Sequence, residues 1–256
     1  MIRAEHITKS FDGRVVLDDI SIEFETGRTN LIIGRSGSGK STLLRCLNHL
    51  ETIDSGEIRI DGRDIRQYDL HSLRERMGIV AQDTVLFNDT IENNIRLGNS
   101  EATREEVMDA ARIANAEQFI AETPYGLETN IGDRGAKLSG GQRQALTLLM
   151  ATLVTPKLLL LDEHTAALDP ATADKVLELT KKIVAENHLT CLMITHNMHD
   201  ALTLGNRTLM MDHGRIVLDI GGEERAHTTV DGLLNRFAEN VGHALDNDRI
   251  LLSKEV

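Results

Sequence analysis

The sequence is poor in cysteine, and neither of its two cysteines lies in a pattern that indicates a cross-link or a metal centre. Cys46 falls within an expected helix and Cys191 within an apolar run. Such surroundings are typical of buried, inert thiols rather than of a disulfide or a nucleophile. The ten histidines show no H-E-x-x-H spacing, so a structural zinc site is not expected. The low cysteine content predicts a protein of a reducing, cytosolic compartment.

Long apolar runs and basic blocks are also missing. The longest apolar segments, 157–161 and 189–194, are far shorter than a span of about 20 residues that crosses a bilayer. The first residues show no signal-peptide pattern. The chain carries 28 basic and 40 acidic residues, a formal net charge of −12, and no concentrated basic face that would suit a phosphate backbone. We therefore expect a cytoplasmic protein that does not bind nucleic acid directly.

What the sequence does contain is a glycine-rich run, GRSGSGKS at 34–41, that fits the phosphate-binding pattern G-x-x-x-x-G-K-[ST]. Small residues let successive N–H groups turn onto a polyphosphate, while the lysine would reach the β- and γ-phosphates and the last serine Mg²⁺. An expected strand at 29–33 and an expected helix at 41–50 supply the usual context. The alternative is a Gly/Ser turn without a ligand. The residues predicted to hold a nucleoside triphosphate here are Gly34, Ser36, Gly37, Ser38, Gly39, Lys40, Ser41 and Thr42.

The remaining apolar runs predict an α/β fold with a mostly parallel sheet. Runs at 77–81, 158–161, 190–194 and 208–211 are typical of strands covered on both faces, and the helical patterns between several of them indicate β–α–β crossovers. Near the N-terminus, apolar residues alternate with polar ones, as in a half-buried antiparallel strand; these apolar residues are Ile20, Ile22 and Phe24.

We expect a single domain over residues 1–256, divided into parts. Residues 1–86 and 158–220 would form the core together with an N-terminal antiparallel subdomain. Residues 87–157 would form an inserted helical subdomain, because this interval has a capping box at 103–106 and little strand character. An apolar stripe follows that box, made by Val107, Ala110, Ala111 and Ala114. Residues 221–256 would form a C-terminal helical extension with an amphipathic helix at 230–237.

A second chemical motif is an apolar strand that ends in two carboxylates, Asp162 and Glu163. Asp162 at the strand tip could hold Mg²⁺ through a water molecule. Glu163 could polarise the water that attacks the γ-phosphate. A solvated acidic turn is the structural alternative, and the phosphate loop makes it the weaker one.

A third motif is LSGGQ at 138–142, followed by a helical pattern. By itself Ser-Gly-Gly before a helix is an ordinary N-cap turn. Together with the two nucleotide motifs, in this order, the run resembles the signature of the ABC (ATP-binding cassette) ATPase family. The resemblance covers roughly residues 2–219 and implies a P-loop NTPase (RecA-like) core. It also implies a head-to-tail homodimer with two ATP molecules between the subunits. The residues that would close on the γ-phosphate held by the other subunit are Ser139, Gly140, Gly141 and Gln142.

The same resemblance assigns four further residues. Gln82 is similar to the family's Q-loop glutamine, a ligand of Mg²⁺ or of the attacking water, and His196 to its switch histidine. Asp169 is similar to the D-loop aspartate that contacts the partner subunit, and it would also cap a helix that begins at Pro170. Phe11 occupies the position of the aromatic residue that stacks on adenine. A surface glutamine and a core phenylalanine are the ordinary alternatives.

Segments of the chain resemble different subclasses of the family. Residues 86–98 and 130–135 are similar to exporters, whose ATPase is fused to membrane helices, whereas 44–56 is more similar to importer subunits made as separate chains. His164 stands where the family usually has a proline that stiffens the turn after the catalytic carboxylate, which puts turnover in question more than binding. An unusual free-standing subunit and an engineered recombination both fit this mosaic.

The resemblance implies an ATPase, peripheral on the cytoplasmic face of a membrane, that energises transport with separate permease subunits. Its cofactors would be ATP and Mg²⁺. The rivals are a soluble ABC ATPase for assembly or remodelling and a cassette with weak turnover. A P-loop kinase is disfavoured, since nothing in a kinase requires LSGGQ. The sequence indicates neither the transported substrate nor the direction of transport.

Overall fold

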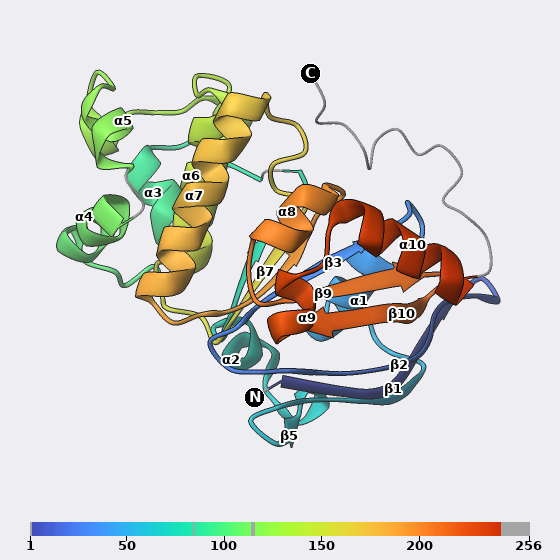
Figure 1. Cartoon of the computed structure of the whole chain (residues 1–256). Coiled ribbons are helices and arrows are strands. Elements are labelled where there is room, and N and C mark those ends of the chain that lie inside the picture. The colour runs from blue at the N-terminus through green and yellow to red at the C-terminus, as the bar shows by residue number, and fades with distance from the viewer. Residues whose placement is uncertain (1, 84, 114–115, 242–256) are drawn as a thin grey trace. The chain divides into compact units, whose positions relative to one another are not determined.

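A computed structural model describes residues 2–83, 85–113 and 116–241 of the chain, shown in Figure 1. The chain forms two compact units. One comprises the described residues of 1–74 and 190–256, and the other those of 75–189. The division expected from the sequence, with boundaries at residues 87, 158 and 221, stays a prediction.

The N-terminal part of the first unit is a four-stranded antiparallel sheet in the order β2-β1-β4-β5. Its strands pair with register shifts along β1, so the ribbon is irregular. In β2 the predicted alternation is confirmed, because Ile20, Ile22 and Phe24 are buried while Ser21 is exposed. The strands of this sheet are β1 (Ile2–Phe11), β2 (Arg14–Phe24), β4 (Ser55–Ile60) and β5 (Arg63–Asp64).

The second sheet of this unit has β3 (Thr29–Gly34) between β8 (Thr190–Ile194) and β9 (Arg207–Asp212), both parallel to it. Strand β10 (Arg215–Gly221) runs antiparallel to β9. All five residues of β8 are buried, as expected for a parallel strand covered on both faces. The apolar runs at 190–194 and 208–211 are therefore confirmed as strands.

Helix α1 (Lys40–Leu47) follows β3 and is shorter than the helix predicted for 41–50. It ends because His49 adopts a left-handed conformation, φ 58°. The Leu50 N–H then donates to Arg45 O and the His49 N–H to Cys46 O, a Schellman ending. The three residues 48–50 thus turn the chain away from the helix axis.

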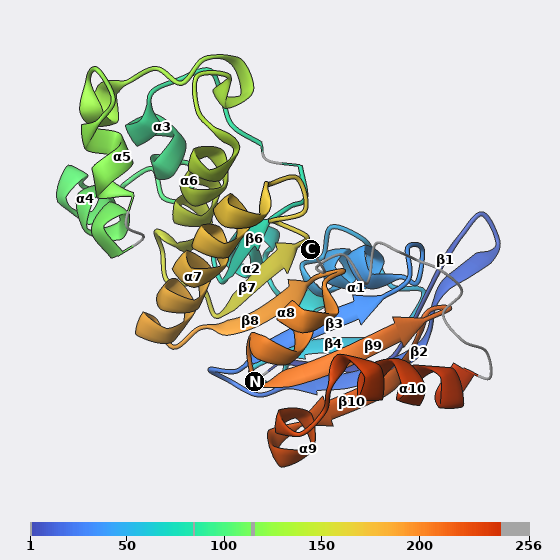
Figure 2. The same cartoon turned by 45° about the horizontal axis from the view of Figure 1, so that its top comes forward.

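Short helical elements complete the first unit. Helix α10 lies along β10 (Figure 2). Its Leu233 and Phe237 side chains are buried, so the helix predicted at 230–237 is confirmed and extends further. The rest of the predicted extension, 242–256, lies outside the described residues. These elements are η1 (Ile65–Gln67), α2 (Leu70–Arg74), α8 (Met198–Thr203), α9 (Gly222–Ala226) and α10 (Val230–Val241).

The second unit contains the parallel pair β6 (Met77–Val80) and β7 (Leu158–Asp162) and a group of helices. Between the two strands the chain is helical, as predicted. The capping box before α4 is confirmed, since Thr103 and Glu106 exchange hydrogen bonds. Ala114 of the expected apolar stripe lies outside the described residues. The helices are α3 (Ile91–Arg96), α4 (Arg104–Ile113), α5 (Glu117–Ala121), η2 (Gly126–Glu128), η3 (Asp133–Gly135), α6 (Gly140–Thr152) and α7 (Pro170–Glu186).

Among the residues that the structure describes, no helix combines the length and the apolar composition that a bilayer crossing needs.

Candidate nucleotide site

The phosphate loop joins β3 to α1 in the first unit, and its glycines are required by geometry. Gly34, Gly37 and Gly39 have φ of 146°, 76° and 99°, a range that favours glycine. A Cβ on Gly34 would lie 2.2 Å from Met211 O, and one on Gly39 would lie 2.7 Å from Val16 O. The loop is therefore held between β2 and β9 with no room for side chains at these two glycines.

Lys40 lies at the start of α1 and is only 7% exposed. Its ammonium donates to Gly34 O at 2.8 Å and to Arg35 O at 3.0 Å, so the side chain folds back over the loop. The N-cap, Gly39, offers no side-chain acceptor, and the start of a helix favours an anion.

The other loop residues differ in exposure. Ser36 and Gly37 are exposed, and Ser41 and Thr42 are half-buried. Ser38 is buried, and its Oγ has no hydrogen-bond partner among the described residues. A buried hydroxyl without a partner costs free energy, so a ligand that supplied one would be stabilised here. The loop fits a polyphosphate.

His196 follows β8 at the same edge of the sheet as the phosphate loop. Strands β3 and β8 are parallel, with Ile32 paired to Ile194. The Thr195 N–H also donates to Ile32 O at 3.1 Å. His196, half-buried, therefore leaves the sheet level with Gly34. The structure brings these two predicted residues to one edge.

Phe11, the predicted adenine platform, ends β1 and is 40% exposed, so the alternative of a core phenylalanine is wrong. Lys9 lies below its ring, with Nζ 4.8 Å from the ring centroid. The Lys9 ammonium is itself buried and lies 3.8 Å from carboxylate oxygens of both Glu51 and Asp54. An anchored cation thus supports one face of the ring.

In the second unit, β7 ends at Asp162 and Glu163 follows in a left-handed conformation, φ 47°. Such backbone is uncommon for a residue with a side chain. Gln82 follows β6 after one residue, and its Nε2 donates to Glu163 Oε2 at 3.2 Å. The structure therefore brings together Gln82 and Glu163, which are 81 residues apart.

His164 comes next and is 2% exposed. Its Nε2 pairs with Thr180 Oγ1 of α7 at 3.1 Å. Burial lowers the pKa of His164 from 6.5 to about 4, because the charged imidazolium would lose its hydration. The neutral ring packs where the family usually has proline, and its hydrogen bond ties the turn after Glu163 to α7.

The LSGGQ segment forms the start of α6. Ser139 is exposed at the N-cap. Its N–H donates to Gln142 Oε1 at 2.8 Å, and the Gln142 N–H donates to Ser139 Oγ at 3.2 Å. A Cβ on Gly140 would lie 2.9 Å from Leu168 Cδ2, and one on Gly141 2.6 Å from Thr172 Cγ2. These glycines allow α6 to approach the start of α7.

Asp169 caps α7 by accepting from the Thr172 N–H at 3.1 Å, as predicted. Hydrogen bonds from Thr172 and other backbone groups hold the pKa of this carboxyl below its usual value. The signature and the D-loop position therefore lie side by side within the second unit.

The predicted magnesium ligands are divided between the units. Ser41 belongs to the first unit, and Asp162 and Gln82 belong to the second. Hydroxyl, carboxylate and amide oxygens are hard ligands of the kind that Mg²⁺ prefers.

The comparison with protein families decides the identity. The family model described as ABC transporter matches residues 17–166, more than half of the chain. This range includes the phosphate loop, LSGGQ and both carboxylates at the end of β7. The chain belongs to the ABC transporter family.

Two known relatives are similar to most of this ABC chain. It is 42% identical over 226 residues to "ABC transporter B family member 24, mitochondrial" of Arabidopsis thaliana, covering 88% of this chain and 32% of that protein. It is 40% identical over 206 residues to "Putative multidrug export ATP-binding/permease protein YgaD" of Bacillus subtilis (strain 168), covering 80% and 35%. The chain thus spans about a third of the length of these relatives.

A solved structure shows the same fold. "Structure of a bacterial Atm1-family ABC exporter with ATP bound" superposes with a TM-score of 0.80 at 36% identity, covering 94% of this chain and 41% of that one. The predicted α/β P-loop NTPase fold is therefore confirmed.

Two contacts of this ABC domain were missed from the sequence. Lys9 and Phe11 lie on the same face of β1, two residues apart, and this spacing was a signal for their contact. The Thr180 partner of His164 had no such signal, because the contact depends on how α7 packs.

Proposed function

We propose that this chain is the ATP-binding and ATP-hydrolysing part of a membrane transporter. The observation that carries the proposal is the phosphate loop, with its left-handed glycines directly before α1, in a chain of the ABC transporter family. The membership gives the class, and the loop geometry supports retained nucleotide binding.

Binding rests on charge and donors. Lys40 gives up its two carbonyl partners and turns to the β- and γ-phosphates, where the N–H groups of α1 add donors. Mg²⁺ would be held by Ser41 Oγ, by the Gln82 amide oxygen and by Asp162, and it would neutralise charge on the phosphate oxygens. Phe11 stacks on the adenine.

Hydrolysis rests on Glu163. Its carboxylate accepts the proton of the attacking water, while the Gln82 bond at 3.2 Å fixes one of its oxygens. His196 would donate a hydrogen bond to the γ-phosphate. The hydrogen bond of His164 to Thr180 holds the turn that carries Glu163.

The full site needs two copies. Ser139 and Gln142 are exposed or half-buried at the start of α6, and ATP held by one copy is closed by these residues of the other, giving a head-to-tail homodimer. This closure would transmit free energy to a membrane part. Two of the relatives named above are exporters by description, which favours the exporter-like segments of the sequence over the importer-like one. Permease helices on the same or on a separate polypeptide both fit.

The test is Glu163→Gln. We expect this variant to bind ATP with an affinity close to that of wild type, because the amide keeps the size of the side chain. Hydrolysis should fall by about 100-fold or more, within the range attributed to general bases, and the variant should accumulate as a dimer with ATP.

The matched control is Glu105→Gln, an exposed glutamate of α4 in the same unit. It should hydrolyse ATP at the wild-type rate. Phosphate release and light scattering at one protein concentration give both readouts. If Glu163→Gln hydrolysed ATP as fast as the control, Glu163 would not be the general base. If neither wild type nor the control hydrolysed ATP, the rival of a cassette with weak turnover would be favoured.

A further inference from the structure

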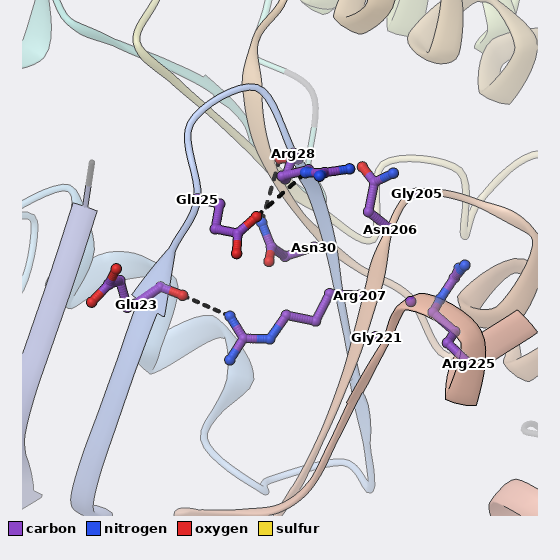
Figure 3. A pocket seen from close by; sticks show the side chains of 10 residues that line it. Glu23, Glu25, Arg28, Asn30, Gly205, Asn206, Arg207, Gly221 and Arg225 are labelled. Carbon is purple, nitrogen blue, oxygen red and sulfur yellow. Dashed lines mark hydrogen bonds and ion pairs between the residues drawn. The ribbon is translucent and has the colours of Figure 1, made fainter.

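A cavity of about 660 Å³ opens in the first unit, away from the phosphate loop. It lies where β3 and β9 begin and β10 ends, next to Asn30, Arg207 and Gly221 (Figure 3). The phosphate loop follows the opposite end of β3. The volume of the cavity is within the range of small-molecule sites. The lining residues that carry charge are Glu23, Glu25, Arg28, Arg207 and Arg225.

Most of these charges are already paired. Glu23 Oε2 lies 3.0 Å from the Arg3 guanidinium, and Glu25 Oε2 lies 3.4 Å from Arg28 Nε. Arg207 is paired with Asp219, and its Nε donates to Asp219 Oδ1 at 2.6 Å. Within the described part of the chain, Arg225 is the lining cation that has no carboxylate partner. The cavity therefore carries one unbalanced positive charge.

Arg225 is also buried, with 9% of its surface exposed. Its Nε donates to Thr208 Oγ1 at 2.8 Å, and its Nη2 donates to Ala201 O at 2.9 Å and to Leu204 O. These bonds cap the end of α8 and fix the plane of the guanidinium. Nη1 has no partner among the described residues and is not enclosed by protein atoms, so its two N–H donors are accessible to a ligand.

Burial lowers the pKa of Arg225 from its ordinary value by desolvation, yet an arginine stays charged at neutral pH. A buried charge without a counter-charge is unfavourable. In Figure 3, Glu23 and Glu25 lie across the cavity from Arg225. An anion next to Nη1 would therefore lie close to the Arg225 charge and away from the two carboxylates.

A second donor comes from Asn206. Its Oδ1 accepts from the Thr29 N–H at 3.0 Å, which assigns the amide orientation. Its Nδ2 has no hydrogen-bond partner among the described residues. Because Asn206 lines the same cavity, this nitrogen is a donor available to a ligand.

We propose that this cavity binds a small oxyanion, the carboxylate or phosphate group of a small molecule, through Nη1 of Arg225 and Nδ2 of Asn206. The site is independent of the proposed ATPase function, since it uses none of the residues assigned to the nucleotide. The bound group supplies the counter-charge that Arg225 lacks.

The test is a titration of the isotope-labelled full chain with acetate and, separately, with inorganic phosphate, followed by amide NMR shifts. We expect saturable shifts at residues 205–207 and 222–225. Phosphate binding at the nucleotide site would appear instead at 34–42, so the two sites are read separately. Saturation by both probes indicates that the site binds carboxylates and phosphates alike. Saturation by only one probe shows which of the two groups the site prefers.

Two variants make the test sharp without removing the cap of α8. Asn206→Asp keeps the acceptor for Thr29 and replaces the donor by a negative oxygen, so the affinity should fall by about tenfold or more. Glu25→Gln frees Arg28 and should raise the affinity. The absence of saturable shifts at 205–207 and 222–225 up to about 50 mM, or equal affinities of wild type and Asn206→Asp, would overturn the proposal.

Discussion

At the scale of single residues, the turn after Glu163 depends on an uncharged histidine. His164 is 2% exposed and its only hydrogen bond among the described residues is to Thr180. Burial lowers its pKa from 6.5 to about 4. Where a proline would stiffen this turn covalently, the histidine does so by packing, and only while it is neutral.

The unfolded chain takes up a proton near pH 6.5, whereas the folded chain takes it up only near pH 4. Stability from this group is therefore complete above pH 6.5 and is lost as the pH falls from 6.5 to 4. Between about pH 7 and about pH 5 the loss should be about 2 kcal/mol.

Urea unfolding of wild type and His164→Gln at the two pH values measures this loss, since glutamine does not titrate. The free energy of unfolding of wild type should fall more than that of the variant by that amount. Equal pH dependence of the two proteins would mean that His164 is not held neutral.

The second prediction at this scale concerns Phe11. Stacking of a base on an aromatic ring is worth about 1–3 kcal/mol, so Phe11→Ala should weaken ATP binding by about tenfold. Phe11→Tyr keeps the ring and should bind like wild type. Lys9→Met removes the cation below the ring and should give an intermediate loss. Calorimetric titration of ATP measures all three, and tight binding by Phe11→Ala would place adenine elsewhere.

At the scale of elements, local patterns in the sequence were enough for most strands and helices. The largely apolar runs at 158–161 and 190–194 were predictable as buried strands, because burial on both faces leaves a nearly continuous signal. The end of α1 was not. His49 takes φ 58°, and a histidine carries no local signal for that conformation as a glycine would.

The contact between α6 and α7 gives a prediction at this scale. Gly141 lies within α6 and would gain helix propensity as alanine, by about 1 kcal/mol. Its Cβ would, however, lie 2.6 Å from Thr172 Cγ2. We therefore expect Gly141→Ala to lower the free energy of unfolding by about 1 kcal/mol, because the overlap outweighs the propensity.

Thr172→Ser removes the methyl group that overlaps. In that background Gly141→Ala should become neutral or stabilising, as urea unfolding of the four proteins would show. A loss of the same size with serine at 172 would mean that the glycine is needed for a reason other than this contact.

At the scale of the whole molecule, the sequence motifs named the candidate residues, but their mutual geometry came from packing. The order of the phosphate loop, LSGGQ and Asp162-Glu163 identified the class. The hydrogen bond between Gln82 and Glu163 joins residues 81 positions apart, and the support of Phe11 by Lys9 involves Glu51 and Asp54 from a later segment. No local pattern contains such contacts.

The central claim is that two copies close head to tail on ATP, with the phosphate loop of one facing LSGGQ of the other. The two natural cysteines will not interfere with thiol cross-linking, because burial raises the pKa of Cys46 to about 11 and of Cys191 to about 12. Arg35→Cys within the loop and Lys137→Cys directly before LSGGQ can therefore carry reactive thiols, each in the Glu163→Gln background.

The most direct measurement mixes these two variants with a short bis-maleimide, with and without ATP and magnesium, and reads the dimers by mass spectrometry. We predict that ATP produces a cross-link between the thiol introduced by Arg35→Cys in one chain and the thiol introduced by Lys137→Cys in the other. Each variant alone should give little cross-linked dimer. Cross-links of Arg35→Cys with itself, or mixed cross-links that are independent of ATP, would contradict the head-to-tail dimer.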